Sequence, residues 1–434
     1  MQINLSSPEL AINGGEPTRK KPWLDNITTG NEEKQAAMRV LDSGYLSLFE
    51  GSHTPDHPFS FKGGPEVLAL EDEWCEYYNV KYSVSMNSAT SGLYAAIGAL
   101  GVGYGDEVIV SPYTMSACAM APMIYGAIPV FADVEIETGS LDPSSIEANI
   151  TENTKAILVV HQFGIPANMP VIMEIAKKHG IKVIEDCAQA HGAKICDQYV
   201  GTIGDIGVFS LNVNKTIQSG EGGVCITNDD DLAYRLKLIR NHGEAVVGPA
   251  NYQNITNITG FNYRMTELSA AISSVQLKKL DHFNMKRLEM VEQLASGIKE
   301  ISFLQPIVSR SEDPSKEIFV PTYYLFPIRF NAKLAGVKRE KFVAAVNAEG
   351  IQFYQGYTEP LYLQPLYQRK ELFKKGYPFS ALANQHLKMN YKKGICPNAE
   401  KLFFDEMIIN EHIRLPHNFE DINNIILAIN KTIN

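Results

Sequence analysis

The chain has 434 residues, of which 45% are hydrophobic and 20% charged, and its formal net charge is −10. This length exceeds what one ordinary hydrophobic core supports, so we expect two or three domains in a soluble globular protein. An acidic balance without any block of like charges argues against nucleic acid or an anionic membrane as a partner, although a small anionic ligand can still bind in a locally positive pocket.

Cysteines and histidines are scattered through the chain rather than clustered. The six cysteines show no CxxC and no paired zinc-ligand spacing, which is typical of a reducing compartment rather than of a disulfide scaffold. His161, His191 and His242 belong to no HExxH or His/carboxylate pattern with ligand spacing, so we expect no metal site. The N-terminus shows no secretory signal, and no apolar run is long enough to cross a bilayer. We therefore expect a cytoplasmic protein without membrane contacts.

Short apolar runs alternate with helical patterns from about residue 80 to 228. Apolar residues recur at helical spacing in Ser91–Leu100 and Met169–His179. Strands that alternate with helices predict βαβ crossovers and a largely parallel sheet covered on both faces. The short connection before the last strand allows that strand to run antiparallel. The runs predicted as strands are Tyr82–Met86, Glu107–Ser111, Ile128–Ala132, Ala156–Val160, Lys182–Glu185, Asp205–Ser210 and Gly223–Thr227.

The second part of the chain has a different character. The pattern from Met265 to about Ile301 predicts one long helix, which would bridge two domains. Beyond it, "TYYLFPIRF", a helix around Lys338–Glu349 and an apolar segment at Met407–Ile409 predict a smaller α/β unit. We expect an N-terminal arm and large domain over residues 1–285 and a smaller domain over 286–434. Long loops are expected at 45–63 and 243–260.

Reactive side chains follow several of the predicted strands. Asp186 ends one strand, Ser210 and Lys215 come off another, and "NSATSG" (87–92) joins the first strand to a helix. Because ligands bind beyond the carboxyl ends of strands in α/β sheets, we expect these groups to gather at one edge. Each also has an ordinary explanation: Thr90 as a helix N-cap, Asp186 as a cap or ion-pair partner, and Lys215 as a solvated surface residue.

Together these groups fit a ligand with an anionic end, a basic ring nitrogen and a carbonyl that reacts with an amine. A helix N-terminus at "SATSG" favours a phosphate. A carboxylate at Asp186 would keep a pyridine nitrogen protonated, which makes the ring an electron sink. A desolvated amine at Lys215 can form a Schiff base. No GxGxxG opens a helix after the first strand and no GxxxxGK[ST] occurs, so the combination favours pyridoxal 5′-phosphate over a nicotinamide or P-loop site.

Several long stretches resemble one family. "EDCAQAHGA", "GDIGVFSLNVNKTIQSGEGGVCITND", "RNHG" and "GFNYRMTELSAAISSVQLKKLD" are similar to the DegT/DnrJ/EryC1/StrS family of pyridoxal-phosphate-dependent sugar aminotransferases. The similarity covers nearly the whole chain, from "INGGEP" onward. It implies an α/β fold of the aspartate-aminotransferase type (fold type I), with a seven-stranded, mixed, mostly parallel sheet between helices and a smaller C-terminal α/β domain.

The resemblance also implies the chemistry of three residues. Lys215 corresponds to the lysine that holds the cofactor as a Schiff base and moves the proton between donor and cofactor. Asp186 corresponds to the partner of the pyridine nitrogen. Gln189 corresponds to a residue that hydrogen-bonds the ring oxygen O3′.

Further residues match the family's contacts to the cofactor phosphate and ring. Thr90, Ser91 and Ser210 match phosphate contacts. Asn262 matches a residue that reaches the phosphate from the neighbouring subunit, which implies a homodimer with shared active sites. The family often stacks an aromatic residue of a "TF" or "TW" pair on the ring; here Met115 holds that place, and a thioether can cover a ring face. Tyr113 is an alternative source of stacking.

The expected reaction takes an amino group from L-glutamate and places it on a keto-sugar, with both half-reactions in one pocket. The implied acceptor is a nucleotide-linked 3-keto or 4-keto deoxysugar in cell-surface polysaccharide (lipopolysaccharide O-antigen) or secondary-metabolite biosynthesis. A cyclitol ketone or a free higher sugar is an alternative acceptor, and a non-catalytic regulator is a further alternative. Related keto-sugar dehydratases carry histidine at the lysine position, and Lys215 argues against that activity because histidine cannot hold the Schiff base.

Overall fold

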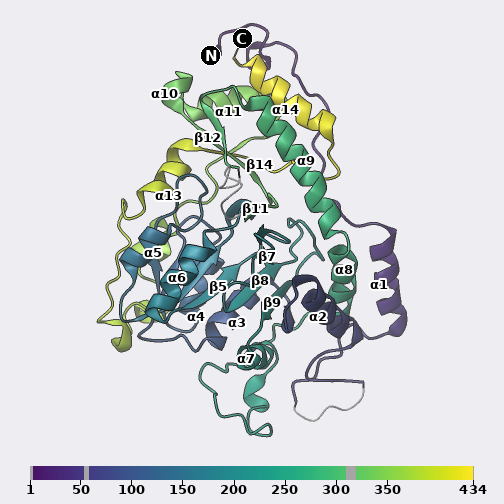
Figure 1. The fold of residues 1–434 in the computed structure, drawn as a ribbon, viewed down its shortest axis with the longest axis vertical. Helices are drawn as coiled ribbons and strands as arrows, with labels where there is room; N and C mark the ends of the chain where they lie inside the picture. Colours follow the sequence, from purple (N-terminus) through teal and green to yellow (C-terminus); the bar gives the residue numbers. More distant parts are fainter. Residues whose placement is uncertain (1–2, 53–57, 309–318, 434) are drawn as a thin grey trace.

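A seven-stranded sheet forms the centre of the molecule (Figure 1). The computed structural model describes residues 3–52, 58–308 and 319–433. Within the sheet the strand order is β1-β9-β8-β5-β4-β2-β3. The strands are β1 (Tyr82–Met86), β2 (Glu107–Val110), β3 (Ile128–Phe131), β4 (Thr154–Val160), β5 (Lys182–Asp186), β8 (Ile206–Ser210) and β9 (Gly223–Thr227).

Pairing within this sheet is parallel except at one strand. The pairs from β8 through β5, β4 and β2 to β3 are all parallel, whereas β9 runs antiparallel to both of its neighbours, β8 and β1. The strand after "GEGG" thus takes the antiparallel course that the short connection before it allowed. The predicted mixed, mostly parallel sheet of seven strands is confirmed.

Helices cover both faces of the sheet, and the strand residues alternate between the two cores. Along β2, Val108 and Val110 belong to the core under α3, α4 and α7, whereas Ile109 belongs to the core under α2, α6 and α8. Burial on both faces explains why the strands are nearly continuous apolar runs. The helices around this sheet are α2 (Pro65–Tyr78), α3 (Ala89–Ala99), α4 (Ala117–Ile124), α5 (Pro143–Asn149), α6 (Met169–His179), α7 (Asp230–Arg240) and α8 (Glu267–Leu277).

The predicted single helix from 265 to 301 is wrong in one respect, because the structure divides it into α8 and α9 (Leu280–Ile298). At the break the backbone N–H of Lys279 donates to the carbonyl of Gln276, a three-residue turn rather than a helical bond. Leu277 and Leu280, on either side of the break, are buried in the same core. Because the apolar spacing continues through the turn, the periodicity does not reveal it.

The C-terminal part forms a smaller unit around a four-stranded sheet of order β10-β12-β14-β13, and α9 runs from the large sheet to this unit (Figure 1). A third, small sheet joins β11 to the hairpin β6–β7. These strands are β6 (Lys194–Ile195), β7 (Gln198–Tyr199), β10 (Leu304–Pro306), β11 (Phe319–Val320), β12 (Phe326–Phe330), β13 (Tyr354–Gln355) and β14 (Met407–Asn410). The helices are α10 (Ala332–Ala335), α11 (Arg339–Ala348), α12 (Pro365–Arg369), α13 (Pro397–Lys401) and α14 (Phe419–Lys431), with a π-helical turn at Leu402–Glu406.

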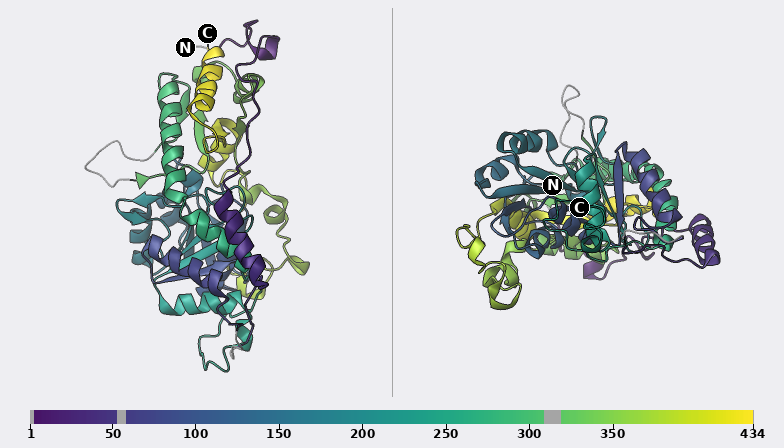
Figure 2. Two further views of the ribbon diagram at one scale, coloured as in Figure 1. Left: turned by 90° about the vertical axis from the view of Figure 1, so that its right-hand side faces the viewer. Right: turned by 90° about the horizontal axis from the view of Figure 1, so that it is seen from below.

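The N-terminal arm starts on the smaller unit. The backbone N–H of Asn4 donates to the carbonyl of Thr432, and both termini lie beside α14 (Figure 1). From there the arm runs along the smaller unit and reaches α1 (Asn31–Ser43), which packs on α8 (Figure 2). The arm therefore contacts both parts of the protein.

The expected loops have little regular structure in the described residues. Within 45–63 a single bridge joins Phe49 to Ser60, and residues 53–57 of that loop lie outside the described residues. The segment 243–260 contains one 3-10 turn, Gly243–Ala245, and is held by Arg235, whose guanidinium donates to the carbonyls of Asn254 and Thr256. Among the described helices, none combines the length and apolar character needed to span a membrane.

Candidate active site

A cavity of about 280 Å³ lies at the carboxyl ends of β5 and β8. Asp186 is the last residue of β5 and Ser210 the last of β8, and these strands are parallel neighbours, so both residues reach the same edge. Six of the eight residues selected from the sequence line this cavity. The lining residues are Ser88, Ala89, Thr90, Leu93, Thr114, Met115, Ala117, Asp186, Ala188, Gln189, Ser210, Asn212, Asn214, Lys215, Glu221 and Tyr324.

The carboxylate of Asp186 is buried at the floor of the cavity. Its Oδ1 accepts the backbone N–H of Ala188 at 2.9 Å, and its Oδ2 accepts the thiol of Cys118, on the first turn of α4, at 3.1 Å. Burial, together with the neighbouring Asp186 charge, raises the pKa of the Cys118 thiol well above its usual range, so the thiol stays protonated as a donor. Two donors from separate elements therefore fix the orientation of the carboxylate.

Lys215 enters the cavity from the loop between β8 and β9. Its side chain is half-buried, and Nζ lies 4.3 Å from the ring centroid of Tyr324. Among the described residues no carboxylate forms an ion pair with this ammonium group. An amine held against an aromatic face without a counter-ion is available for reaction with a ligand.

The N-terminus of α3 forms another wall. The side chain of Ser88 caps the helix by accepting the backbone N–H of Ser91 at 3.0 Å, and Ser88 and Thr90 both line the cavity. Ser91 does not line it, because its buried hydroxyl donates to Oδ1 of Asn87. The cap lies two residues earlier than Thr90, the N-cap considered from the sequence, which places Ser88 at the cavity. The orphan N–H groups of this end and the helix dipole favour an anion.

Gln189 connects the cavity to the smaller unit. Its Oε1 accepts the backbone N–H of Phe163 at 2.8 Å, and its Nε2 donates to the hydroxyl of Tyr357 at 2.9 Å. Burial raises the pKa of Tyr357, so the phenol remains protonated. Tyr113 packs edge-on against the rings of Phe163 and Tyr357 and is fully buried outside the cavity. Met115, in contrast, lines the cavity with an exposed side chain. The thioether of Met115, and not the ring of Tyr113, therefore lines the cavity.

Asn262 lies apart from the cavity of its own chain. Its side chain is exposed, and its Oδ1 accepts Nε of Arg264 at 2.8 Å. Tyr324, in contrast, lines the cavity although no motif selected it, because it arrives from the segment before β12. Its contact with Lys215 joins residues more than a hundred positions apart, and no local sequence pattern encodes such a contact.

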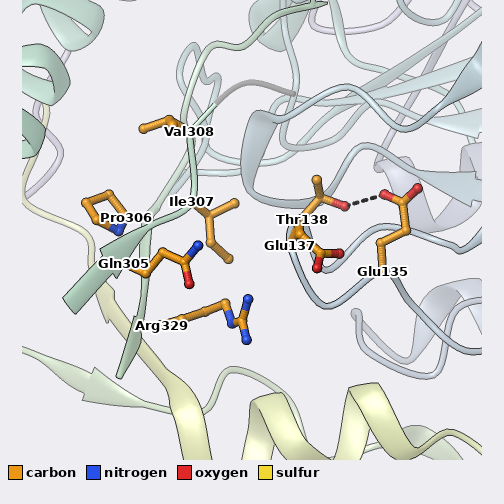
Figure 3. Close-up of a pocket in the computed structure, with 8 residues that line it drawn as sticks. All are labelled: Glu135, Glu137, Thr138, Gln305, Pro306, Ile307, Val308 and Arg329. Atoms are coloured by element: carbon orange, nitrogen blue, oxygen red, sulfur yellow. Dashed lines mark hydrogen bonds between the residues drawn. The ribbon is translucent and has the colours of Figure 1, made fainter. Parts of the chain in front are cut away.

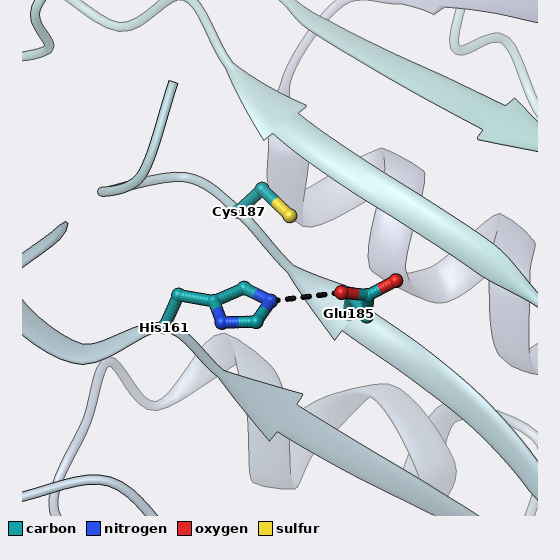
Figure 4. Close-up of side chains that lie close together, drawn as sticks. All are labelled: His161, Glu185 and Cys187. Atoms are coloured by element: carbon teal, nitrogen blue, oxygen red, sulfur yellow. Dashed lines mark hydrogen bonds and ion pairs between the residues drawn. The ribbon is translucent and has the colours of Figure 1, made fainter. Parts of the chain in front are cut away.

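A buried cluster of His161, Glu185 and Cys187 lies at the carboxyl ends of β4 and β5 (Figure 4). The backbone N–H of Ala167 donates to Nδ1 of His161, so the ring proton is on Nε2 and is donated to Glu185 at 3.0 Å. The same carboxylate accepts three backbone N–H groups of the 201–204 loop at 2.6–2.8 Å. Burial keeps the Cys187 thiol protonated by raising its pKa. His161 and Glu185 are therefore held by hydrogen bonds to each other and to the backbone, at the strand ends next to Asp186.

A second cavity, of about 380 Å³, lies between the segment after β3 and the strands β10 and β12 (Figure 3). Glu135, Glu137 and Thr138 lie on one side, and Arg329 lies on the other. The guanidinium of Arg329 already pairs with Glu406 at 2.9 Å. This lining provides no amine, so a lysine that can form a Schiff base is found in the cavity of Asp186 and not in this one.

The chain is similar to known aminotransferases. The model of the DegT/DnrJ/EryC1/StrS aminotransferase family matches residues 56–404. L-glutamine:2-deoxy-scyllo-inosose aminotransferase of Streptomyces kanamyceticus is 34% identical over 374 residues, which cover 84% of this chain and 83% of that protein. GDP-perosamine synthase of Escherichia coli O157:H7 is 36% identical over 297 residues, 68% of this chain and 74% of that protein. The crystal structure of an aminotransferase from Psychrobacter cryohalolentis has a TM-score of 0.78 at 28% identity and covers 95% of this chain and 98% of that one.

These matches extend over most of the chain and confirm the resemblance found in its motifs. The structure also has the sheet and the smaller unit expected for fold type I. The protein is therefore an aminotransferase that belongs to the DegT/DnrJ/EryC1/StrS family.

Proposed function

We propose that the cavity between Asp186 and Lys215 binds pyridoxal 5′-phosphate and that the protein transfers an amino group onto a keto-sugar with its help. The observation that carries this proposal is the meeting of a fixed carboxylate, an unpaired amine and a helix N-terminus in one cavity of an aminotransferase. The bound cofactor would supply an electron sink for the exchange of the amino group.

The residues present fit such a group. The cavity volume is close to the lower end of the range for small-molecule sites. Thr114 lines it with a buried hydroxyl that has no hydrogen-bond partner among the described residues, so the site offers an unused polar contact. The N-terminus of α3 would hold the phosphate together with Thr90 and Ser210, and Met115 would cover one ring face.

The proposed roles follow from placement. Asp186, held by Cys118 and Ala188, would keep the ring nitrogen protonated. Lys215 would bind the cofactor aldehyde and, once displaced by the amino donor, hold the proton removed from the donor carbon at Nζ. Gln189 would bond the ring oxygen O3′ with the amide hydrogen that Tyr357 leaves free.

Lys215→Ala tests the assignment. Loss of both the covalent and the proton-transfer contribution predicts a rate below about a thousandth of wild type. Lys177→Ala, on the exposed face of α6, is the matched control and keeps full activity. A rate above that limit in Lys215→Ala would contradict the assigned role. Asp186→Ala is expected to slow the donor-dependent loss of cofactor colour in stopped-flow experiments, and an unchanged rate would refute its assignment.

The proposed acceptor is a nucleotide-linked 3-keto or 4-keto deoxysugar, with L-glutamate as donor. The similarity to a GDP-perosamine synthase supports a nucleotide-linked sugar as the acceptor. A second candidate pair, a cyclitol ketone with L-glutamine, is favoured by the relative from Streptomyces kanamyceticus. Assays that cross both donors with a panel of nucleotide keto-sugars and scyllo-inosose distinguish the two. Activity on the cyclitol alone would overturn the first choice.

We also propose a homodimer in which Asn262 of each chain completes the site of the other. In support, Asn262 is exposed and outside its own cavity, and apolar side chains are exposed on nearby N-terminal elements. Those side chains are Met38, Leu41, Leu46 and Leu68. Mixing inactive Lys215→Ala with Asn262→Ala protein should restore about a quarter of the wild-type sites, because hybrid dimers contain one intact site. No recovery after subunit exchange would refute sharing.

A further inference from the structure

The N-terminal arm crosses from the smaller unit to the loop that carries Lys215. On the smaller unit, Arg19 forms a buried ion pair with Asp421 at 2.7 Å, and the indole N–H of Trp23 donates to the carbonyl of Gly350 at 2.9 Å. These contacts fix the arm just before it reaches the large sheet. Only a few residues separate Trp23 from the loop that carries Lys215, so the anchor on the smaller unit restrains the arm where it meets that loop.

At the other end, Asn26 contacts the lysine itself. Its side-chain Nδ2 donates two hydrogen bonds, to the carbonyl of Val213 at 2.9 Å and to the carbonyl of Lys215 at 3.0 Å. Among the described residues no other group donates to the Lys215 carbonyl. Two residues later, Thr28 donates to Gln276 at 2.9 Å, and the same amide oxygen accepts the backbone N–H of Gln218 at 3.3 Å. The arm therefore lies along the loop that presents the lysine.

The loop also has hydrogen bonds of its own just before the lysine. The backbone N–H of Lys215 donates to the carbonyl of Asn212 and that of Val213 to the carbonyl of Gly220, both at 2.9 Å, and that of Asn214 donates to Oδ1 of Asn212 at 3.2 Å. Val213 and Asn214 are exposed. A lysine side chain has high rotamer entropy, so holding its amine at one point requires a fixed Cα. Asn26 bonds the carbonyl of Lys215 itself and the carbonyl of Val213, two residues before it.

We propose that Asn26 is a positioning residue for Lys215: its amide fixes the backbone of the lysine so that Nζ stays at the reacting centre. This inference rests on the proposed role of Lys215. It predicts that loss of the two hydrogen bonds slows the steps that depend on Nζ while acceptor binding is preserved, because Asn26 does not line the cavity.

The test uses Asn26→Asp, which keeps the shape but replaces the donors with acceptors facing two carbonyls, and Asn26→Ala, which only removes them. We expect kcat to fall by roughly tenfold in Asn26→Ala and further in Asn26→Asp, with KM for the acceptor unchanged. Thr28→Val is the matched control, because it removes a neighbouring arm contact without touching Lys215, and it should retain kcat.

Two further readouts do not depend on turnover. The rate at which apoprotein reacts with pyridoxal 5′-phosphate, followed by absorbance, should fall in both Asn26 variants and not in Thr28→Val. Hydrogen exchange of the 213–216 amides, which Thr28 does not contact, should accelerate in the same two variants. Equal effects in Thr28→Val would show that only general arm docking matters and would overturn the inference. If Lys215→Ala also kept full activity, the proposed function itself would fail, whereas unaffected Asn26 variants beside an inactive Lys215→Ala would refute only the role of Asn26.

Discussion

Gly164 offers the sharpest test of how the smaller unit shapes the active site. It has a φ of +85°, and a Cβ added there would lie 2.7 Å from the carbonyl oxygen of Gln189. The same Cβ would lie 2.7 and 2.8 Å from the backbone nitrogens of Tyr323 and Tyr324. This close approach brings the Tyr324 segment onto the cavity, and Arg287 holds it there by donating to the carbonyls of both tyrosines at 2.8 and 2.9 Å.

Gly164→Ala would therefore have two separate costs. Left-handed backbone costs a non-glycine residue about 1–2 kcal/mol. Relief of the overlap requires a shift of several tenths of an ångström in backbone that Arg287 holds, which adds about 1–3 kcal/mol. We expect a total destabilisation of roughly 2–5 kcal/mol. Because Gln189 and Tyr324 both move, we also expect kcat/KM to fall by about tenfold to a hundredfold.

Chemical denaturation and steady-state kinetics of the purified variant measure both effects. Gly101→Ala is the matched control, since Gly101 has a φ of +74° with nothing within 4 Å of an added Cβ. The stability of Gly101→Ala should fall only by the cost of the left-handed backbone, and its kcat/KM should be unchanged. If the two variants lost equal stability and Gly164→Ala kept its activity, the close approach at Gly164 would not govern the site.

Two further predictions concern buried ionisable groups. Glu71→Ala leaves the fully buried Arg240, now paired with Glu71 at 2.5 Å, without its carboxylate, so unfolding should become easier by about 3–5 kcal/mol. Glu147→Ala, in an exposed pair, should leave the denaturation midpoint unchanged, and equal effects would contradict the reasoning. Burial lowers the pKa of His191 to about 3, so the unfolded state binds the extra proton below about pH 6.5 and stability falls from there towards pH 3. Between pH 7 and pH 5 this should cost about 2 kcal/mol, and His191→Leu should remove that slope; an unchanged slope would exclude His191 as its source.

The sequence indicated the strands of the large sheet and two of the residues that meet in the cavity at its edge. Alternating apolar runs and helical periodicity are local properties, and they indicated the strands of the large sheet. The antiparallel direction of β9 was allowed by the short connection before it. Asp186 and Lys215 were found because the rule that ligands bind at strand ends converts a position along the chain into a place in the fold.

Local patterns failed where a boundary depends on one turn. The helix after β1 begins early enough that Ser88, and not Ser91, faces the cavity, although both are small hydroxyl residues in one motif. The break between α8 and α9 was also missed, because Leu277 and Leu280 continue the same apolar spacing through it. In both places the residue types are compatible with either arrangement, and packing decides.

Contacts between distant segments were decided by the tertiary structure alone. Tyr324 over Lys215, Tyr357 on Gln189 and Asn26 on the Lys215 carbonyl each join residues more than a hundred positions apart. No propensity or periodicity encodes such pairs, since they arise only when the smaller unit and the arm pack against the edge of the sheet. The sequence by itself thus determined which groups can do the chemistry, and the packing of the two units determined how those groups are held.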